Sequence, residues 1–413
     1  MPASAELDYA CLDPIVEARA IWIDAGAVPK TPDEIRKLVR AYHAANLNVL
    51  FPEVICRGYA VYPSNLLARD PRFAGACDPL PVIIREAHKL GMEVHPWVWV
   101  FRAGYTKDRG AILTAHPEWA ELGSDGNDLS PNGALWICPA VPAARDLLAA
   151  LFAELVTCYD IDGVHLDYIR YEVESPVPYG YSDASRALFA KQYGIDPLDI
   201  DDIPIHQYEW RKFRERQINT FVQRIALQTR SIKPNVKLSA AVGPIPNDAR
   251  RELMQNWVNW LDNKWLDFIV PLSYDSDDEH FRRVVMREKA ATGTRSIVIS
   301  GIGSKALRDV QPMVRQIAIS REAAAEGQAL FAASYFKETQ AAPLASGPYA
   351  HPSALPFRNP RQNADALCRH ADESRSRGDR DLANYLASRA RDLAAYASYQ
   401  EARIGYIRPT PPP

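Results

Sequence analysis

Short apolar runs alternate with longer segments of helical periodicity along most of this chain. Each run is rich in β-branched and aromatic residues and is bounded by polar or turn-forming residues, as buried strands are. The runs cover residues 18–26, 48–54, 92–100, 161–169, 236–242, 266–274, 296–302 and 328–336. Eight strands separated by helices predict a (β/α)₈ TIM barrel, an α/β fold, over about residues 15–340.

The segments between the runs contain start and stop signals for helices. Thr31 is placed to cap a helix, with Pro32 at its first position and Glu34 completing a capping box. Gly91 stands where the next helix would end in the left-handed conformation. A doubly wound open sheet is the competing fold, but the turn after the first run lacks its glycine-rich signature. Further amphipathic patterns cover residues 142–159, 207–231, 250–262, 279–291 and 309–326.

The end of the chain differs from the barrel in composition. Residues 341–360 are rich in Pro and Ala and predict a linker or an extended wrap. Residues 361–405 return to a helical period that breaks near Gly378, which predicts a helical hairpin as a C-terminal extension. We expect residues 406–413 to be disordered. The predicted plan is therefore a catalytic barrel over residues 1–340, a linker, a helical extension that caps the bottom of the barrel, and a tail.

Composition and charge exclude several classes of protein. Apolar residues make up 47% of the chain, charged residues 24%, and the net charge is −3. These values predict a globular protein without the basic stripe of a nucleic-acid binder or a membrane-surface binder. The N-terminus lacks the apolar segment of a secretory signal, and no run is long enough to span a bilayer, so we expect a cytoplasmic protein, or a secreted one if a leader was trimmed. The six cysteines have no C-x-x-C spacing, so we expect no zinc site and no cofactor, while the oligomeric state is left open.

Polar residues gather at the ends of the predicted strands, where barrel enzymes carry their catalytic groups. Side chains alternate along the stretch DGVHLDYIRY, so His165 and Asp167 share one face, and Val164 and Leu166 share the other. If the apolar pair faces the helices, His165 and Asp167 point into the barrel near its mouth. An ionised Asp in that position needs a partner. It either forms an ion pair, for example with Arg170, that merely closes the core, or it takes part in chemistry.

Carboxylates at a barrel mouth with aromatic side chains around them favour glycoside hydrolysis. That reaction needs one carboxylic acid to protonate the leaving oxygen and a second carboxylate to act as nucleophile or base. Asp167 is the first candidate, and Asp275 and Glu53 compete for the partner role. Long connections over residues 103–140 and 171–181 add aromatic residues that suit the faces of a carbohydrate substrate. The candidate substrate-binding residues are Arg57, His95, Trp97, Trp136, His165, Tyr168, Arg170, Tyr171 and Tyr274.

Two other functions stay open at this point. His95, His165, Asp167 and Asp275 can be read as ligands of a divalent metal ion, which would make the barrel a metal-dependent hydrolase or deacetylase. Against this, the first strand offers no H-x-H pair, and no other His lies near a strand end. The second alternative is a non-catalytic carbohydrate-binding barrel. In any of these proteins, a single aromatic residue can also serve only to anchor its loop to the barrel.

The sequence resembles the glycosyl-hydrolase-like 10 family, bacterial barrels described as family 10 glycosylhydrolases. The resemblance is carried by the segments RAIWIDAG, HPEW, YDIDGVHLDYIRY, QYGIDP, KLSAAV and WLDFIVPLSY, and by the stretch from Asp78 to Gly104. Its most specific parts are that stretch and the motif D-G-[IV]-H-[FL]-D-[YD], here residues 162–168. Together these segments cover about residues 18–335.

The resemblance implies action on bacterial polysaccharides, with peptidoglycan glycan strands as one substrate in the wider family. The family pattern carries over to His165, Asp167 and Tyr168 in one strand and to Tyr274 in another. The chain departs from the pattern in two ways. Many members are secreted or lipid-anchored, and the family usually has Gln in FQVR where this chain has Glu53 in FPEV. The sugar, its linkage, the anomeric outcome and the choice between endo and exo action stay open.

Overall fold

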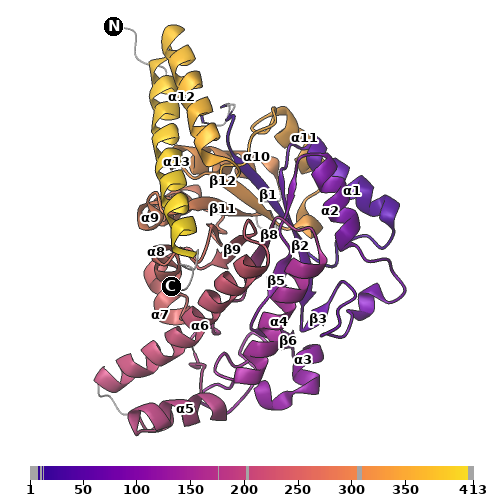
Figure 1. The fold of residues 1–413 in the computed structure, drawn as a ribbon, viewed down its shortest axis with the longest axis vertical. Helices are drawn as coiled ribbons and strands as arrows, with labels where there is room; N and C mark the ends of the chain where they lie inside the picture. Colours follow the sequence, from indigo (N-terminus) through magenta and orange to yellow (C-terminus); the bar gives the residue numbers. More distant parts are fainter. Residues whose placement is uncertain are drawn as a thin grey trace, which may run out of the picture.

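A closed barrel of parallel strands forms the centre of the protein, as a computed structural model shows (Figure 1). The structure describes residues 8, 9, 12, 14–174, 176–200, 204–304 and 309–407. Within this part of the chain, β1 pairs with both β12 and β2, which closes a ring of eight strands. The ring consists of β1 (Ala18–Ile23), β2 (Val49–Cys56), β4 (Glu93–Val94) with β5 (Trp97–Trp99) as one interrupted strand, β8 (Gly163–Asp167), β9 (Lys237–Val242), β10 (Phe268–Pro271), β11 (Ile297–Gly303) and β12 (Gly327–Phe331).

Helices follow the strands and surround the ring, so the predicted (β/α)₈ architecture is confirmed. The helix predicted over residues 250–262 is two helices, because Met254 has a φ of 55° and turns the chain out of the helical path. The helices are α1 (Pro32–Ala44), α2 (Leu80–Lys89), α3 (Gly110–Ala115), α4 (Pro142–Cys158), α5 (Asp183–Tyr193), α6 (Pro204–Ile232), α7 (Pro246–Leu253), α8 (Trp257–Asp262), α9 (Asp278–Thr292), α10 (Val310–Glu322), α11 (Glu338–Ser346), α12 (Pro360–Ser376) and α13 (Arg380–Ile407). Among the described residues, none of these helices is both long and apolar enough to cross a bilayer.

Additional short strands follow β2 and β5 at the mouth of the barrel. The strand β3 (Tyr59–Ala60) pairs antiparallel with the end of β2, and β6 (Arg102–Tyr105) pairs with β7 (Ala134–Trp136). These elements lie in Figure 1 at the end of the molecule opposite α12 and α13. They place loop residues over the carboxyl ends of the barrel strands.

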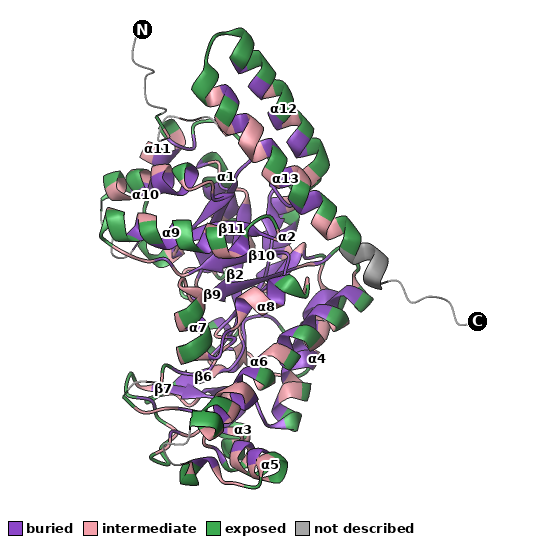
Figure 2. Cartoon of the chain, turned by 90° about the vertical axis from the view of Figure 1, so that its left-hand side faces the viewer, coloured by how far each residue is buried: buried purple, intermediate pink, exposed green. Residues whose placement is uncertain are grey.

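Alternation along each strand separates two apolar regions. Val164 and Leu166 belong to the core between the strands and the helices, whereas Trp22, Phe51 and Phe268 fill the interior of the barrel. Figure 2 shows the strands as buried and the outer faces of the surrounding helices as largely exposed. The predicted outward direction of Val164 and Leu166 is therefore confirmed, and the intervening side chains of the same strand face inward.

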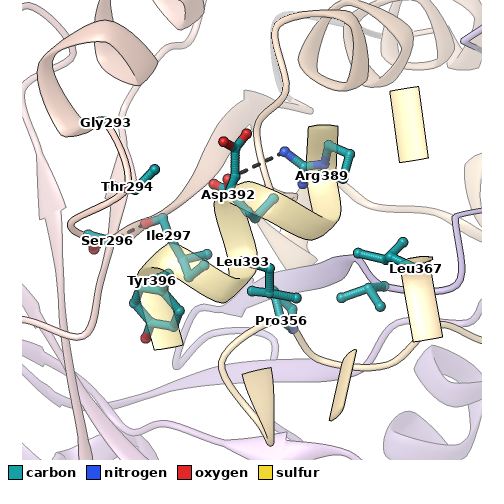
Figure 3. Close-up of a pocket in the computed structure, with 12 residues that line it drawn as sticks. Gly293, Thr294, Ser296, Ile297, Pro356, Leu367, Arg389, Asp392, Leu393 and Tyr396 are labelled. Atoms are coloured by element: carbon teal, nitrogen blue, oxygen red, sulfur yellow. Dashed lines mark hydrogen bonds and ion pairs between the residues drawn. The ribbon is translucent and has the colours of Figure 1, made fainter. Parts of the chain in front are cut away.

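The C-terminal helices pack against the bottom of the barrel. Before α12, Phe357 enters the lower end of the barrel and stacks on Phe268, with ring centroids 4.7 Å apart. A cavity of only about 10 Å³ remains at the junction with the helices, where Figure 3 shows Leu393 and Tyr396 of α13 next to Ile297. The helical extension and its capping position therefore follow from an apolar face that covers the open base of the strands.

The segment between the barrel and this extension is only partly extended. Residues 341–346, within the predicted linker, belong to α11. The predicted disordered tail, residues 406–413, lies outside the described residues except for positions 406 and 407, which end α13.

Replacing Phe357 with Ala tests whether the C-terminal segment supports the barrel. Phe357 is buried, so Phe357→Ala should lower the free energy of unfolding by about 3–5 kcal/mol. Urea unfolding followed by circular dichroism measures the effect, with the exposed Leu227→Ala as control. An unchanged urea midpoint for Phe357→Ala would show that the Phe357 ring at the lower end of the barrel adds nothing to stability.

Candidate active site

The inward-facing side chains of the middle strands form an aromatic layer below the mouth. His165 is fully buried, stacks on Phe51 with ring centroids 4.3 Å apart, and shares a hydrogen bond of 2.9 Å with Ser239. Burial lowers the pKa of His165 well below its ordinary value, and the charge of His95 acts in the same direction. His165 is thus a neutral packing residue of the barrel interior.

His95 lies still closer to the bottom of the barrel. Its ring is fully buried against Phe268 and Phe357, and its Nε2 atom is 3.0 Å from a carboxylate oxygen of Glu93. Sequence reasoning predicted His95 and His165 as substrate-binding residues. The structure places neither of them on the wall of the mouth cavity.

A cavity of about 480 Å³ opens at the carboxyl ends of the strands. Its walls carry two carboxylates, two arginines and several aromatic rings, which come from the barrel strands β1, β2, β5, β8 and β12 and from the segments that follow them. The lining residues include Asp24, Glu53, Arg57, Arg72, Trp97 and Trp99. Concave sites that combine aromatic walls with a few polar groups are typical of small-molecule binding.

Glu53 is the buried carboxyl group of this cavity, with 5% of its surface exposed. It lies within β2, three residues before the end of that strand, and the backbone N–H of Ala25 donates to its Oε2 atom at 2.8 Å. Burial raises the pKa of Glu53 to about 7, and the charges of Asp24 and Asp167 raise it as well, against the opposing Ala25 N–H and Arg72. Glu53 therefore carries a proton in a substantial fraction of molecules at neutral pH.

Asp167 lies at the end of β8, directly behind Trp97 and Tyr168, which line the cavity. The indole N–H of Trp97 donates to its Oδ2 atom at 2.9 Å, and the backbone N–H of Tyr168 donates to Oδ1 at 2.6 Å. Burial raises the pKa of Asp167, while these two donors and the charges of Arg170 and Arg102 oppose the increase. The two donors thus favour the ionised form of Asp167, in a side chain that is 8% exposed.

Asp24 is a third carboxylate at the mouth, and sequence reasoning missed it. Ser334, beyond the end of β12, donates to it from both its backbone N–H and its hydroxyl. The signal was present, because Asp24 directly follows the buried strand β1 and so stands at a strand end. Arg72 was also missed, and it comes from a loop with no strand-end position to mark it.

Aromatic rings form one wall of the cavity. Tyr168 has a φ of 50°, which turns the chain sharply after β8. Its ring lies edge-on to Trp99 at 4.9 Å, and Trp99 contacts Tyr105 at 6.2 Å. The guanidinium of Arg102 lies over all three rings, at 4.5 to 5.4 Å from their centroids. A cation packed against several rings holds them in fixed orientations.

Other predicted binding residues lie behind this wall. Trp136 and Tyr171 are each only 2% exposed. Trp136 donates its N–H to Glu172 at 3.0 Å, and Arg170 lies over the Trp136 ring at 5.0 Å. These residues anchor the loops that carry the wall, and the structure does not bring Trp136 or Tyr171 to the cavity surface.

Arg57 and Tyr274 reach the mouth in different ways. Arg57 lines the cavity, and its charge is matched by ion pairs with Asp70 at 3.2 Å and Asp108 at 2.7 Å. Tyr274 packs its ring on Phe331 at 5.2 Å, and its buried hydroxyl has no hydrogen-bond partner among the described residues. Burial raises the pKa of Tyr274 well above its ordinary value, and the charge of Asp167 adds to the effect.

Glycine makes the position of Tyr274 possible. A Cβ atom on Gly301 would lie 2.5 Å from the carbonyl oxygen of Pro271 and 3.0 Å from the Tyr274 ring. A Cβ atom on Gly303 would lie 3.2 Å from the Tyr274 side chain. Strand β11 therefore leaves room for the ring beside Asp167.

Asp275 is not part of this cavity wall. Its carboxylate bonds to His280 and to the backbone N–H of Asp277, at the start of α9. The N–H of Asp277 lowers the pKa of Asp275, as does the hydrogen bond with His280. The four residues considered as metal ligands are thus dispersed, and the described residues contain no group of three or more His, Cys, Asp or Glu side chains that could hold a metal ion.

Comparison with known proteins gives one family. The model described as "Glycosyl hydrolase-like 10" matches residues 17–306. The chain is 26% identical to "Glycosyl hydrolase YngK" of Bacillus subtilis over 304 residues, covering 62% of this chain and 54% of YngK. It is 25% identical to "Glycosyl hydrolase DigH" of Escherichia coli over 262 residues, covering 55% of this chain and 54% of DigH. The chain thus spans about half the length of these curated relatives.

Solved structures share the barrel. An α-L-fucosidase from Paenibacillus thiaminolyticus matches with a TM-score of 0.57 and 17% identity, over 79% of this chain and 48% of that one. The catalytic domain of a β-amylase from Paenibacillus polymyxa matches with a TM-score of 0.53 and 12% identity, over 80% and 95%. These likenesses support the fold.

Two tryptophans in β5 allow the bond to Asp167 to be tested. Trp97→Phe keeps a ring but removes the N–H donor, whereas the buried N–H of Trp99 has no partner among the described residues, so Trp99→Phe is a matched control. The folded-state pKa of Asp167 already lies above its unfolded value, so Asp167 costs stability progressively as the pH rises. Trp97→Phe should raise this pKa further and lower the free energy of unfolding at pH 8 by about 1.5–3 kcal/mol, with a smaller loss at pH 4. Urea unfolding at both pH values measures it, and equal losses for the two variants would contradict the assignment.

Proposed function

The chain belongs to the glycosyl hydrolase-like 10 family, and we propose that it hydrolyses O-glycosidic bonds of a bacterial-type poly- or oligosaccharide at the mouth of its barrel. The observation that carries the proposal is the pairing of two buried carboxyl groups, Glu53 and Asp167, on the two sides of Trp97. Strand β5 lies between β2 and β8, Glu53 is in register with Trp97, and Trp97 donates to Asp167. The relatives YngK and DigH, which are named as glycosyl hydrolases, support the same class of reaction.

The surroundings of the two groups assign them different roles. Glu53, with a pKa of about 7, is suited to donate a proton to the glycosidic oxygen as the bond to the leaving sugar breaks. Asp167 is held by two N–H donors and stays ionised more readily, so it attacks the anomeric carbon or activates a water molecule there. Environments that push the protonation of two carboxyl groups apart are how such enzymes separate acid from nucleophile or base. Trp99 and Tyr168 then receive the faces of the sugar rings.

Substitution of each carboxylate tests this assignment once a substrate is found. A panel of polysaccharides and peptidoglycan fragments is first screened with the wild-type protein for new reducing ends. Asp167→Asn and Glu53→Gln should then each lower turnover by about 100- to 10,000-fold on the cleaved glycan. Asp275→Asn should keep wild-type turnover, because the Asp275 carboxylate is bonded to His280 and to the backbone N–H of Asp277 at the start of α9. A folded Asp167→Asn protein with wild-type turnover would refute the assignment, and binding without any turnover would identify a non-catalytic barrel.

The pH dependence tests the role of Glu53 separately. The general acid must be protonated in the free enzyme, so kcat/KM should fall as the pH rises through about 7. Glu53→Gln should lose this alkaline limb and should retain activity best on aryl glycosides whose leaving group needs no proton. A wild-type profile with no group titrating between pH 6 and 8 would argue against Glu53 as the acid.

A further inference from the structure

A second groove lies outside the barrel, along the first half of α6. Helix α6 has 29 residues and is about 43 Å long. The preceding barrel strand, β8, has only 5 residues, and α5 lies between the two elements. The helix therefore overshoots the barrel, and Figure 1 shows α5 and the start of α6 extending past the sheet at the end where β3 and β6 lie. A small core of Phe189, Trp210 and Phe213 ties α5 to α6, so this projection is packed.

The groove runs between α6 and the segment containing α7 and α8. Two adjoining cavities, of about 270 and 660 Å³, share Tyr208, Lys212, Glu215 and Arg250 and so form one continuous depression. None of these residues lines the cavity at the barrel mouth. The groove is therefore separate from the site proposed for catalysis.

The floor of the groove is a fixed polar network. The side chain of Glu215 is only 6% exposed, and it accepts hydrogen bonds from Arg250 at 3.0 Å, Asn256 at 2.6 Å and Lys212 at 3.5 Å. Burial alone would raise the pKa of Glu215, but the bonds from Asn256 and Arg250 lower it, so the carboxylate stays charged. Donors whose positions are fixed in this way lose little entropy when they bind a ligand.

Further groups at the groove have unused hydrogen-bonding capacity. Asn219 accepts a hydrogen bond from the indole N–H of Trp260 at 2.6 Å, which orients its amide and leaves the Nδ2 hydrogens without a partner in the described part of the chain. Arg216 bonds to Gln192 and Tyr193 at 3.4 and 3.5 Å and has no carboxylate partner within the described ranges. The groove thus offers several donors to a ligand rich in hydroxyl oxygens.

An exposed aromatic ring completes the groove. Tyr208 is 54% exposed, and the ammonium of Lys212 lies 5.7 Å from its ring centroid. A protein interface would need an apolar centre, whereas the walls here are charged or carry amide groups, except for the rings of Tyr208 and Tyr193. Sugar rings have an apolar face of C–H groups and an edge of hydroxyl groups, so a glycan chain matches one exposed ring beside fixed donors.

We propose that this groove is a second, non-catalytic binding surface for a glycan chain, with a sugar ring stacked on Tyr208 and hydroxyl groups bound by Lys212, Arg250 and Asn219. The inference rests on the proposed action on a glycan, and it adds a place where a long substrate is held away from the barrel mouth. A polymer bound at both sites gains effective concentration at the mouth.

Affinity electrophoresis of the full chain tests the proposal. The gels contain hydroxyethyl cellulose, glycol chitin or polygalacturonate, which cover neutral, N-acetylated and acidic glycans. The protein carries Asp167→Asn so that no probe is cleaved. We expect at least one polysaccharide to retard it, and added Tyr208→Ala to weaken that binding at least about tenfold, a loss of about 1.4 kcal/mol. Tyr208→Phe and Leu227→Ala, an exposed site on the same helix, should leave the retardation unchanged.

Two further variants separate this groove from the barrel mouth. Tyr208→Ala in the otherwise wild-type chain should keep the kcat/KM for a short oligosaccharide, because Tyr208 does not line the cavity at the barrel mouth. Retardation that persists in Tyr208→Ala but disappears in Trp99→Ala would place all binding at the mouth and overturn the proposal. The absence of retardation by all three polysaccharides would overturn it as well. Hydrolysis by the wild-type chain is measured in a separate experiment, so failure of the groove proposal can be distinguished from failure of the proposed function.

Discussion

The hydrogen bond from the Trp97 indole to Asp167 joins the packing of the barrel to its proposed chemistry. It crosses from β5 to β8, so the position of a carboxylate at the mouth depends on a ring that is itself fixed among the interior aromatics. On the other side of β5, Glu53 is in register with Trp97. Side chains alternate between the interior and the exterior of a closed barrel. The alternation directs Trp97 and Asp167 toward the interior, and the carboxyl groups near the strand ends therefore lie close to the mouth.

The charges around the mouth are arranged so that few are free. Arg57 and Arg72 form ion pairs with Asp70, and Arg57 also pairs with Asp108, whereas Arg102 and Arg170 are packed on aromatic rings. The carboxyl groups of Glu53 and Asp167 are buried and have fewer direct partners, and burial raises the pKa of both. Groups with perturbed pKa values beside a cavity are candidates for functional residues. Burial at the mouth thus raises both pKa values, and the N–H donors to each carboxyl group offset part of the increase.

The sequence predicted the ring of strands, because period-two alternation and helix signals repeat locally, and it predicted which face of β8 points inward. It also predicted Glu53, Trp97 and Tyr168 at the mouth, from the rule that strand ends carry chemistry. Depth along the strand was not predictable: His95 and Asp167 obey the same alternation but lie at opposite ends of the barrel. The burial of Trp136 and the position of Arg72 on the cavity wall depend on long loops. The path of these loops is determined by tertiary packing.

We expect Glu53 and Asp167 to be electrostatically coupled at the barrel mouth. Carbon-13 NMR of the side-chain carboxyl groups measures this coupling directly, with Glu53→Gln and Asp167→Asn used to assign the resonances. We expect a Glu carboxyl resonance with a titration midpoint near pH 7 that vanishes in Glu53→Gln. In Asp167→Asn this midpoint should shift to lower pH, because a negative neighbour has been removed. Titration of Glu53 near its ordinary value of 4.5, or a midpoint that Asp167→Asn leaves unchanged, would contradict it.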